Sequence, residues 1–235
     1  MAELSIVGFC PRSRRFGIGA VSDRPGGFGD RLAVQAWRGL VYCHGGPAHR
    51  SVRRAEQHLA QGWRGAALLD ALRSPAAAED GGAGEDAERL LLTIDAQGRI
   101  AASTGAAVQR SSYFRDGSGR AAASTGVASA SAVVAMLKAF DDGHDDDMAE
   151  RLLRSLEAGA TAADQPGSSA FLRVHDPSIE YAFTDVTVDL HEAPVAALRR
   201  AHDWLSPLYG YYAQRGQDPT IARYPQWLTQ QGIKR

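Results

Sequence analysis

The stretch ELSIVGFCPRSRRFGIGAVS, residues 3–22, contains two short apolar runs joined by a polar connection. Leu4–Phe9 is apolar and partly β-branched, and Phe16–Ser22 is built mainly from small residues. Runs of this length and composition are typical of β-strands. Because the connection Cys10–Arg15 is short, we expect the two runs to pair antiparallel as a hairpin, with Leu4–Phe9 as a buried central strand.

Blocks of strands and helices alternate along the rest of the chain. Further strands are predicted at Leu32–Ala36, Gly39–Cys43, Leu90–Ile94, Ile100–Ser103, Ser169–Val174 and Ile179–Leu190. Several of these pairs are close enough to form hairpins, which impose antiparallel pairing. The predicted fold class is therefore α+β, a layered sandwich of three or four layers with mainly antiparallel sheets, rather than a doubly wound parallel sheet.

The helical segments carry apolar stripes that indicate their buried faces. We expect helices between Ser51 and Leu72, broken at Gly62, and a later one that begins at Pro194. The two strongest stripes lie on Ala128–Phe140, with Val133, Val134, Leu137 and Phe140, and on Met148–Ala158, with Leu152, Leu153 and Leu156. These two helices are expected to cover one outer face of the sheets.

The chain is short enough to form one large core. At 235 residues it lies near the top of the single-domain range. We expect one domain over residues 1–208 and read Ser74–Glu88, rich in Gly and acids, as a mobile loop. The aromatic tail, residues 209–235, is expected to pack on the domain or on a partner. A homodimer is compatible with this tail, and the sequence leaves the oligomeric state open.

The composition of the chain limits which classes of binding partner and which cellular compartment we expect. The net charge of −1 provides no long-range field for nucleic acids or anionic membranes. Apolar runs fall far short of the roughly 20 residues that span a bilayer. Cys10 and Cys43 are too few for a disulfide scaffold or a four-thiolate metal site, and the basic cluster follows the first apolar run, unlike a secretory signal. We expect a cytoplasmic protein that binds a small molecule, without nucleic acid, membrane, metal or organic cofactor.

Several ordered segments together resemble a known family. They are Ser5–Val7, Pro11–Ser22, Ile94–Gly105, Ala149–Gly159, Ser169-Ala170 and the run from Val188 to Val195 that contains Asp189, His191 and Pro194. In this order and spacing they resemble the family catalogued as domain of unknown function 1028, which is related to the N-terminal-nucleophile (Ntn) hydrolases. The resemblance runs from Glu3 to about Leu205.

The resemblance implies an α-β-β-α sandwich and the hydrolysis of a small-molecule amide or related C–N bond. In Ntn hydrolases the first strand begins with Thr, Ser or Cys, whose own free α-amine acts as the base. Here Glu3 stands where the family has Thr, and Ala2 precedes it. A carboxylate has no hydroxyl or thiol proton to lose, and the amine of Glu3 is tied up in a peptide bond.

Other positions of the implied site are changed as well. Cys43-His44 replaces a Thr-Gln or Ser-Gln pair, Ala123–Thr125 replaces Gln-Gly-Asn, and Gln165–Ser169 replaces an Arg-Gly-x-Gln-Ser segment. Two functions stay open. One is a diverged hydrolase with an altered active site, and the other is a catalytically silent small-molecule-binding or scaffolding protein.

Glu3 and Cys43 are the candidate catalytic residues. Glu3 is a candidate general base or cation-binding group, and its alternative is an exposed acid at a strand end. Cys43 is a candidate nucleophile whose alternative is a core thiol. Because neighbouring strand residues point to opposite faces, Cys43 needs a base other than His44, such as His49.

The candidate substrate-binding residues are Ser5, Ser22, His44, Thr104, Thr125 and Ser168. We expect one pocket at the open end of the sheets, formed by Glu3, Ser5, Ser22, Cys43, Thr104 and Thr125, with Gly26–Asp30 and Gln165–Ser168 at its rim. His144–Asp147 has the composition of a metal site, but Asp147 is better explained as a helix N-cap. His191 is interpreted as marking a helix entry.

Overall fold

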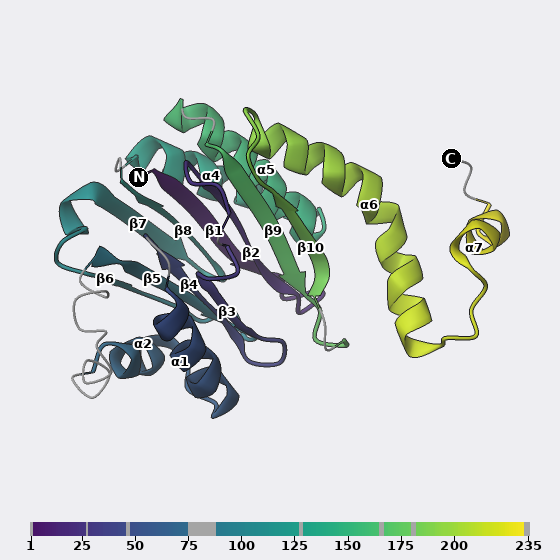
Figure 1. Cartoon of the computed structure of the whole chain (residues 1–235), viewed down its shortest axis with the longest axis horizontal. Coiled ribbons are helices and arrows are strands. Elements are labelled where there is room, and N and C mark those ends of the chain that lie inside the picture. The colour runs from purple at the N-terminus through teal and green to yellow at the C-terminus, as the bar shows by residue number, and fades with distance from the viewer. Residues whose placement is uncertain are drawn as a thin grey trace.

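The computed structural model describes residues 2–26, 28–45, 48–74, 88–126, 129–164, 167–179 and 182–232. Their strands form a six-stranded sheet in the order β10-β9-β2-β1-β8-β7 and a four-stranded sheet in the order β3-β4-β5-β6. Figure 1 shows the two sheets facing each other, with helices on both outer sides. The fold is an α+β sandwich of four layers, which confirms the fold class predicted from the sequence.

The six-stranded sheet is organised around β1. It contains β1 (Glu3–Phe9), β2 (Phe16–Ser22), β7 (Ser112–Gly117), β8 (Arg120–Thr125), β9 (Ser169–His175) and β10 (Ala182–Val188). The predicted hairpin is confirmed, with Glu3 opposite Ser22 and Phe9 opposite Phe16. On its other side β1 pairs antiparallel with β8. The first strand is therefore central, as predicted.

Two strand predictions differ from the structure. The hairpin of β7 and β8 was not predicted, because three alanines in Arg120–Thr125 carry little strand signal. Its pairing with β1 makes this segment a strand. The expected strand Ile179–Leu190 is shorter, and ends at Val188 before Leu190, whose φ of 51° is incompatible with extended backbone.

The four-stranded sheet is covered by the first two helices. It contains β3 (Leu32–Gln35), β4 (Gly39–His44), β5 (Leu90–Asp95) and β6 (Ile100–Thr104). The helices are α1 (His49–Ala60) and α2 (Gly65–Leu72), and the predicted break at Gly62 is confirmed, with a φ of 92° there. Their apolar faces pack on the outward side of β4 and β5, around Val41 and Leu91. Most of the expected loop, residues 75–87, lies outside the described residues.

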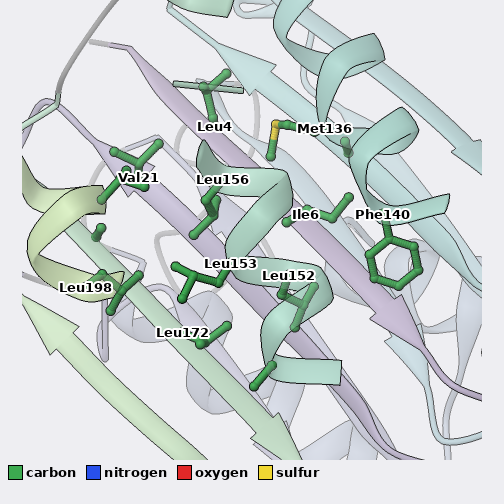
Figure 2. Close-up of a cluster of buried hydrophobic side chains, with 14 of the residues drawn as sticks. Leu4, Ile6, Val21, Met136, Phe140, Leu152, Leu153, Leu156, Leu172 and Leu198 are labelled. Carbon is green, nitrogen blue, oxygen red and sulfur yellow. The ribbon is translucent and has the colours of Figure 1, made fainter. Parts of the chain in front are cut away.

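The opposite outer layer is formed by α4 (Ala130–Asp142), α5 (Met148–Ala163) and α6 (Pro194–Gln217). Figure 2 shows Leu4 and Ile6 of β1 among the side chains that these helices contribute, including Met136, Phe140 and Leu153. The buried face of α4 is rotated from the predicted one, because Val134 is 44% exposed while Met136 is fully buried.

The helix boundaries follow from local sequence signals. The side chain of Asp147 accepts hydrogen bonds from the backbone N–H groups of Ala149 and Glu150, so its N-cap role is confirmed. The helix layer lies very close to the central strands. A Cβ on Gly8 would come within 2.4 Å of the Phe140 ring, and one on Gly19 within 2.9 Å of Leu156. Glycines in this hairpin therefore permit the contact between helices and sheet.

The expected boundary between residues 208 and 209 falls inside α6. In Figure 1 the C-terminal half of α6 and the short helix α7 (Tyr224–Gln230) project away from the sheets. The tail folds back on α6, where the Tyr211 ring lies 5.3 Å from the rings of both Tyr224 and Trp227. Within the described part of the chain, no helix combines the length and apolarity needed to cross a membrane.

Replacing Leu153 by alanine tests the packing of the helix layer. Leu153 is fully buried, so Leu153→Ala should lower the free energy of unfolding by about 2–5 kcal/mol. Val134→Ala, on the exposed face of α4, is the control and should change it by less than about 0.5 kcal/mol. Urea unfolding monitored by circular dichroism measures both. A loss below about 1 kcal/mol for Leu153→Ala would contradict the assigned core.

Candidate functional site

Polar side chains replace the apolar core at one end of the space between the sheets. On β1 the side chains alternate, so Glu3 and Ser5 share the face of Val7, which packs in the layer between the two sheets. Tyr42 lines the same layer on β4, and His44 follows it two residues later. These four side chains therefore face one another across the sandwich.

Glu3 forms a buried ion pair with Arg31. Arg31 Nη1 donates to Glu3 Oε2 over 3.0 Å, and the two residues are 3% and 1% exposed. The Tyr42 hydroxyl donates to Glu3 Oε1, and the backbone N–H of Gly45 lies 3.4 Å from Oε2. Burial and then the negative charge of Glu3 raise the pKa of Tyr42 well above its usual value, which keeps this donor protonated. The carboxylate is thus held as a charge partner.

Arg31 links this end of β1 to the connection that follows β2. Its Nη2 donates to the carbonyl oxygen of Gly26 over 3.2 Å. Its guanidinium also lies over the Phe28 ring, 4.7 Å from the ring centroid. The ion pair therefore fixes the connection as well as neutralising Glu3.

His44 forms a second cluster with two hydroxyl groups. Its Nε2 lies 2.6 Å from Ser5 Oγ, and its Nδ1 lies 3.3 Å from Thr125 Oγ1. Burial lowers the pKa of His44, so the imidazole is neutral at pH 7. A neutral imidazole has one N–H donor and one acceptor nitrogen. One hydroxyl consequently accepts from the ring, and the other donates to it.

The His44 cluster borders a cavity of about 460 Å³ at the open end of the sandwich. Its lining residues are Arg24, His44, Gly45, Glu88, Ala107, Val108, Ser111, Thr125 and Gly126. His44 and Thr125 are the buried polar residues of this lining, with exposures of 0% and 6%. Glu3 and Ser5 lie behind them and are absent from the lining. The cavity has the size of a small-molecule site.

The structure brings together several predicted site residues. Glu3, Ser5, His44 and Thr125 are connected as described above. Ser22 lies opposite Glu3 in the β1–β2 register and therefore on the same face, and its Oγ accepts a hydrogen bond from the backbone N–H of Arg24. Arg31 and Tyr42 were not predicted. Tyr42 has a sequence signal, since it lies two residues before His44 on the same strand face.

Cys43 does not join this site, which corrects the prediction of a catalytic thiol there. It points to the other face of β4 and packs under α1, beside Val52. His49, the base that it was expected to use, is exposed and lies 3.4 Å from a carboxylate oxygen of Asp30. The thiol is a core residue.

Thr104 and Ser168 also lie outside the cavity lining. Thr104 is exposed at the end of the edge strand β6, opposite Leu90. Ser168 donates its backbone N–H to Ser22 and accepts from His191, just before β9. Of the expected rim, residues 27, 165 and 166 lie outside the described residues. Among the residues that are described, no group of three or more His, Cys, Asp or Glu is arranged to hold a metal ion.

Comparison with known proteins identifies the family. The sequence profile of a family of unknown function, DUF1028, matches residues 4–198. The chain belongs to the DUF1028 family. It also matches the crystal structure of protein SPO2555 from Silicibacter pomeroyi, assigned to DUF1028, with a TM-score of 0.76 and 22% identity over 97% of this chain and 93% of that one. At that identity the likeness shows the fold alone.

No curated protein matches this DUF1028 chain. The family and the solved structure therefore support the layered fold without assigning an activity. The chemistry of the site has to be argued from its own residues.

Removing Arg31 tests the ion pair beneath the site. Arg31→Met leaves the buried Glu3 carboxylate without its cation, and we expect a loss of about 3–5 kcal/mol in the free energy of unfolding. Lys138→Met, which breaks a pair with Asp142 whose side chains are 73% and 54% exposed, is the control and should cost less than about 1 kcal/mol. Guanidinium denaturation measures both. Equal losses would contradict the assigned role of Arg31.

Proposed function

We propose that this protein is a small-molecule hydrolase that cleaves an amide or related C–N bond with Thr125 as nucleophile and His44 as general base. The observation that carries the proposal is the His44 cluster. A neutral, buried imidazole lies 3.3 Å from the Thr125 hydroxyl at a cavity of ligand size and is supported from behind by Ser5. Nucleophile, base and orienting group occur in this order in hydrolases with activated hydroxyls.

Glu3, the first residue of β1, cannot be the nucleophile here. The amine of Glu3 is part of a peptide bond to Ala2, and its carboxylate is paired with Arg31 and Tyr42. The mechanism implied by the Ntn resemblance is therefore replaced in this proposal by one that uses the neighbouring strands β4 and β8.

The proposed reaction consumes only the substrate and one water molecule, and Thr125 and His44 are regenerated. Thr125 Oγ1 bonds to the carbonyl carbon while its proton passes to His44 Nδ1. The C–N bond then breaks, and the imidazolium gives the proton to the departing nitrogen, which leaves an ester on Thr125. Water attacks this ester and gives a proton to His44, which passes it to Thr125 as the acid departs. Amide and water thus yield a carboxylic acid and an amine.

One observation favours the second candidate, a protein that binds a small molecule without turning it over. The group behind His44 is the neutral hydroxyl of Ser5, whereas the carboxylate of Glu3 is committed to Arg31. An imidazolium formed during catalysis would therefore lack the contacting carboxylate found in Ser-His-Asp triads. The activity test separates the two candidates.

Turnover of small amides, lactams and activated esters by the full chain tests the proposal. Thr125→Val keeps the side-chain shape but removes the hydroxyl, and we expect the rate to fall at least about 100-fold. Thr104→Val is the matched control, because Thr104 is exposed at the end of β6 outside the cavity lining, and should keep the rate. Binding without turnover in the wild type would favour the silent candidate.

The pH dependence of kcat/KM reports the state of His44. Because burial lowers the pKa of His44, its neutral, basic form persists below pH 6.5, the usual value for histidine. The rate should therefore stay level from pH 8 to about 6.5 and decline only at lower pH, as His44 becomes protonated. An acidic limb with an apparent pKa above about 6.5 would assign the base to another group.

A further inference from the structure

Two opposite charges line the same cavity from different sheets. Arg24 follows β2 of the six-stranded sheet, and Glu88 precedes β5 of the four-stranded sheet. Both residues are exposed, and neither side chain makes a hydrogen bond or ion pair with another described residue. Since His44 is neutral, the described residues of the lining present one positive and one negative charge to a ligand.

We propose that the cavity binds a zwitterionic amino-acid derivative, with its carboxylate at Arg24, its ammonium at Glu88 and a side-chain amide directed at Thr125. The position of the amide rests on the proposed function, whereas the ligand class rests on the two charges. A ligand with one charge would gain one attractive contact and meet one repulsive charge. A zwitterion satisfies both.

The rest of the lining suits the uncharged part of such a molecule. Ala107 and Val108 contribute apolar surface for a short hydrocarbon chain. Gly45 and Gly126 lie beside His44 and Thr125 with φ values of 112° and 91°, a conformation that favours glycine. Because neither has a side chain, backbone rather than bulk borders the cavity next to the reacting groups.

The planar guanidinium of Arg24 can donate two parallel hydrogen bonds to a carboxylate, whereas a lysine would act only as a point charge. Glu88 accepts hydrogen bonds and matches an ammonium, which only donates. The cavity volume of about 460 Å³ is within the range of small-molecule sites and is large enough for a lysine-sized molecule.

A matched set of three amides tests the ligand class. Nε-acetyl-lysine carries both charges, 6-acetamidohexanoate lacks the ammonium, and N-acetylcadaverine lacks the carboxylate. Calorimetric titration into the full-length Thr125→Val protein at low salt avoids turnover. We expect the zwitterion to bind roughly fivefold more tightly than either relative, as an additional partly exposed ionic contact provides.

Substituting either charged cavity residue should abolish the contribution of one ligand charge to the affinity. Arg24→Gln is expected to reduce the affinity for Nε-acetyl-lysine to that for N-acetylcadaverine, and Glu88→Gln to reduce it to that for 6-acetamidohexanoate. Arg200→Gln, an exposed arginine on α6 outside the cavity lining, is the control and should change neither. Equal affinities for the three compounds, absence of binding by all three, or insensitivity to both cavity substitutions would overturn the proposal.

The two proposals fail in different ways. If the wild type hydrolyses uncharged amides but shows no preference for the zwitterion, the ligand class is wrong and the hydrolase stands. If the zwitterion binds with both charge preferences but no amide is cleaved, the ligand class stands and the hydrolase is wrong.

Discussion

The structure depends on the burial of β1 on both faces. A central strand between two layers must match a different environment with each alternate side chain. Leu4 and Ile6 pack under the helices, whereas Ser5 and Val7 face the opposite sheet. The same alternation places Glu3 in the interior, where an unpaired carboxylate would be costly. The position of Arg31 follows from this constraint, since its cation compensates the buried charge.

Because the charge of Glu3 is neutralised by Arg31, a different residue has to act as the base in the proposed reaction. Arg31, Tyr42 and the Gly45 backbone occupy the carboxylate, so it has no free role at the cavity. His44 is the neighbouring titratable group that both touches hydroxyls and reaches the lining. A shift of β1 by one residue would turn Glu3 toward the apolar helix layer, so the ion pair also favours a single register.

Strand and helix periodicity predicted the first hairpin, the stripe on α5 and the layered class, because each has a strong local pattern. The alanine-rich strand β8 escaped prediction, since its conformation comes from pairing with β1 rather than from its own residues. Alternation correctly separated Cys43 from His44 but did not indicate which one faces the cavity. The contact of Arg31 with Glu3 joins residues 28 positions apart through a connection without periodicity, so no local signal foretold it.

The close contact between glycines of the β1–β2 hairpin and the helices makes this part of the molecule sensitive to substitution, unlike the exposed residues of the cavity. A side chain on Gly8 would overlap the Phe140 ring and one on Gly19 would overlap Leu156, so substitutions at these positions force the helix side chains to repack. The side chains of Arg24 and Glu88, by contrast, are exposed and can change without repacking the core. Substitutions at Arg24 and Glu88 can therefore alter what the cavity recognises at little cost to the fold, whereas substitutions at Gly8 and Gly19 cannot avoid the helix layer.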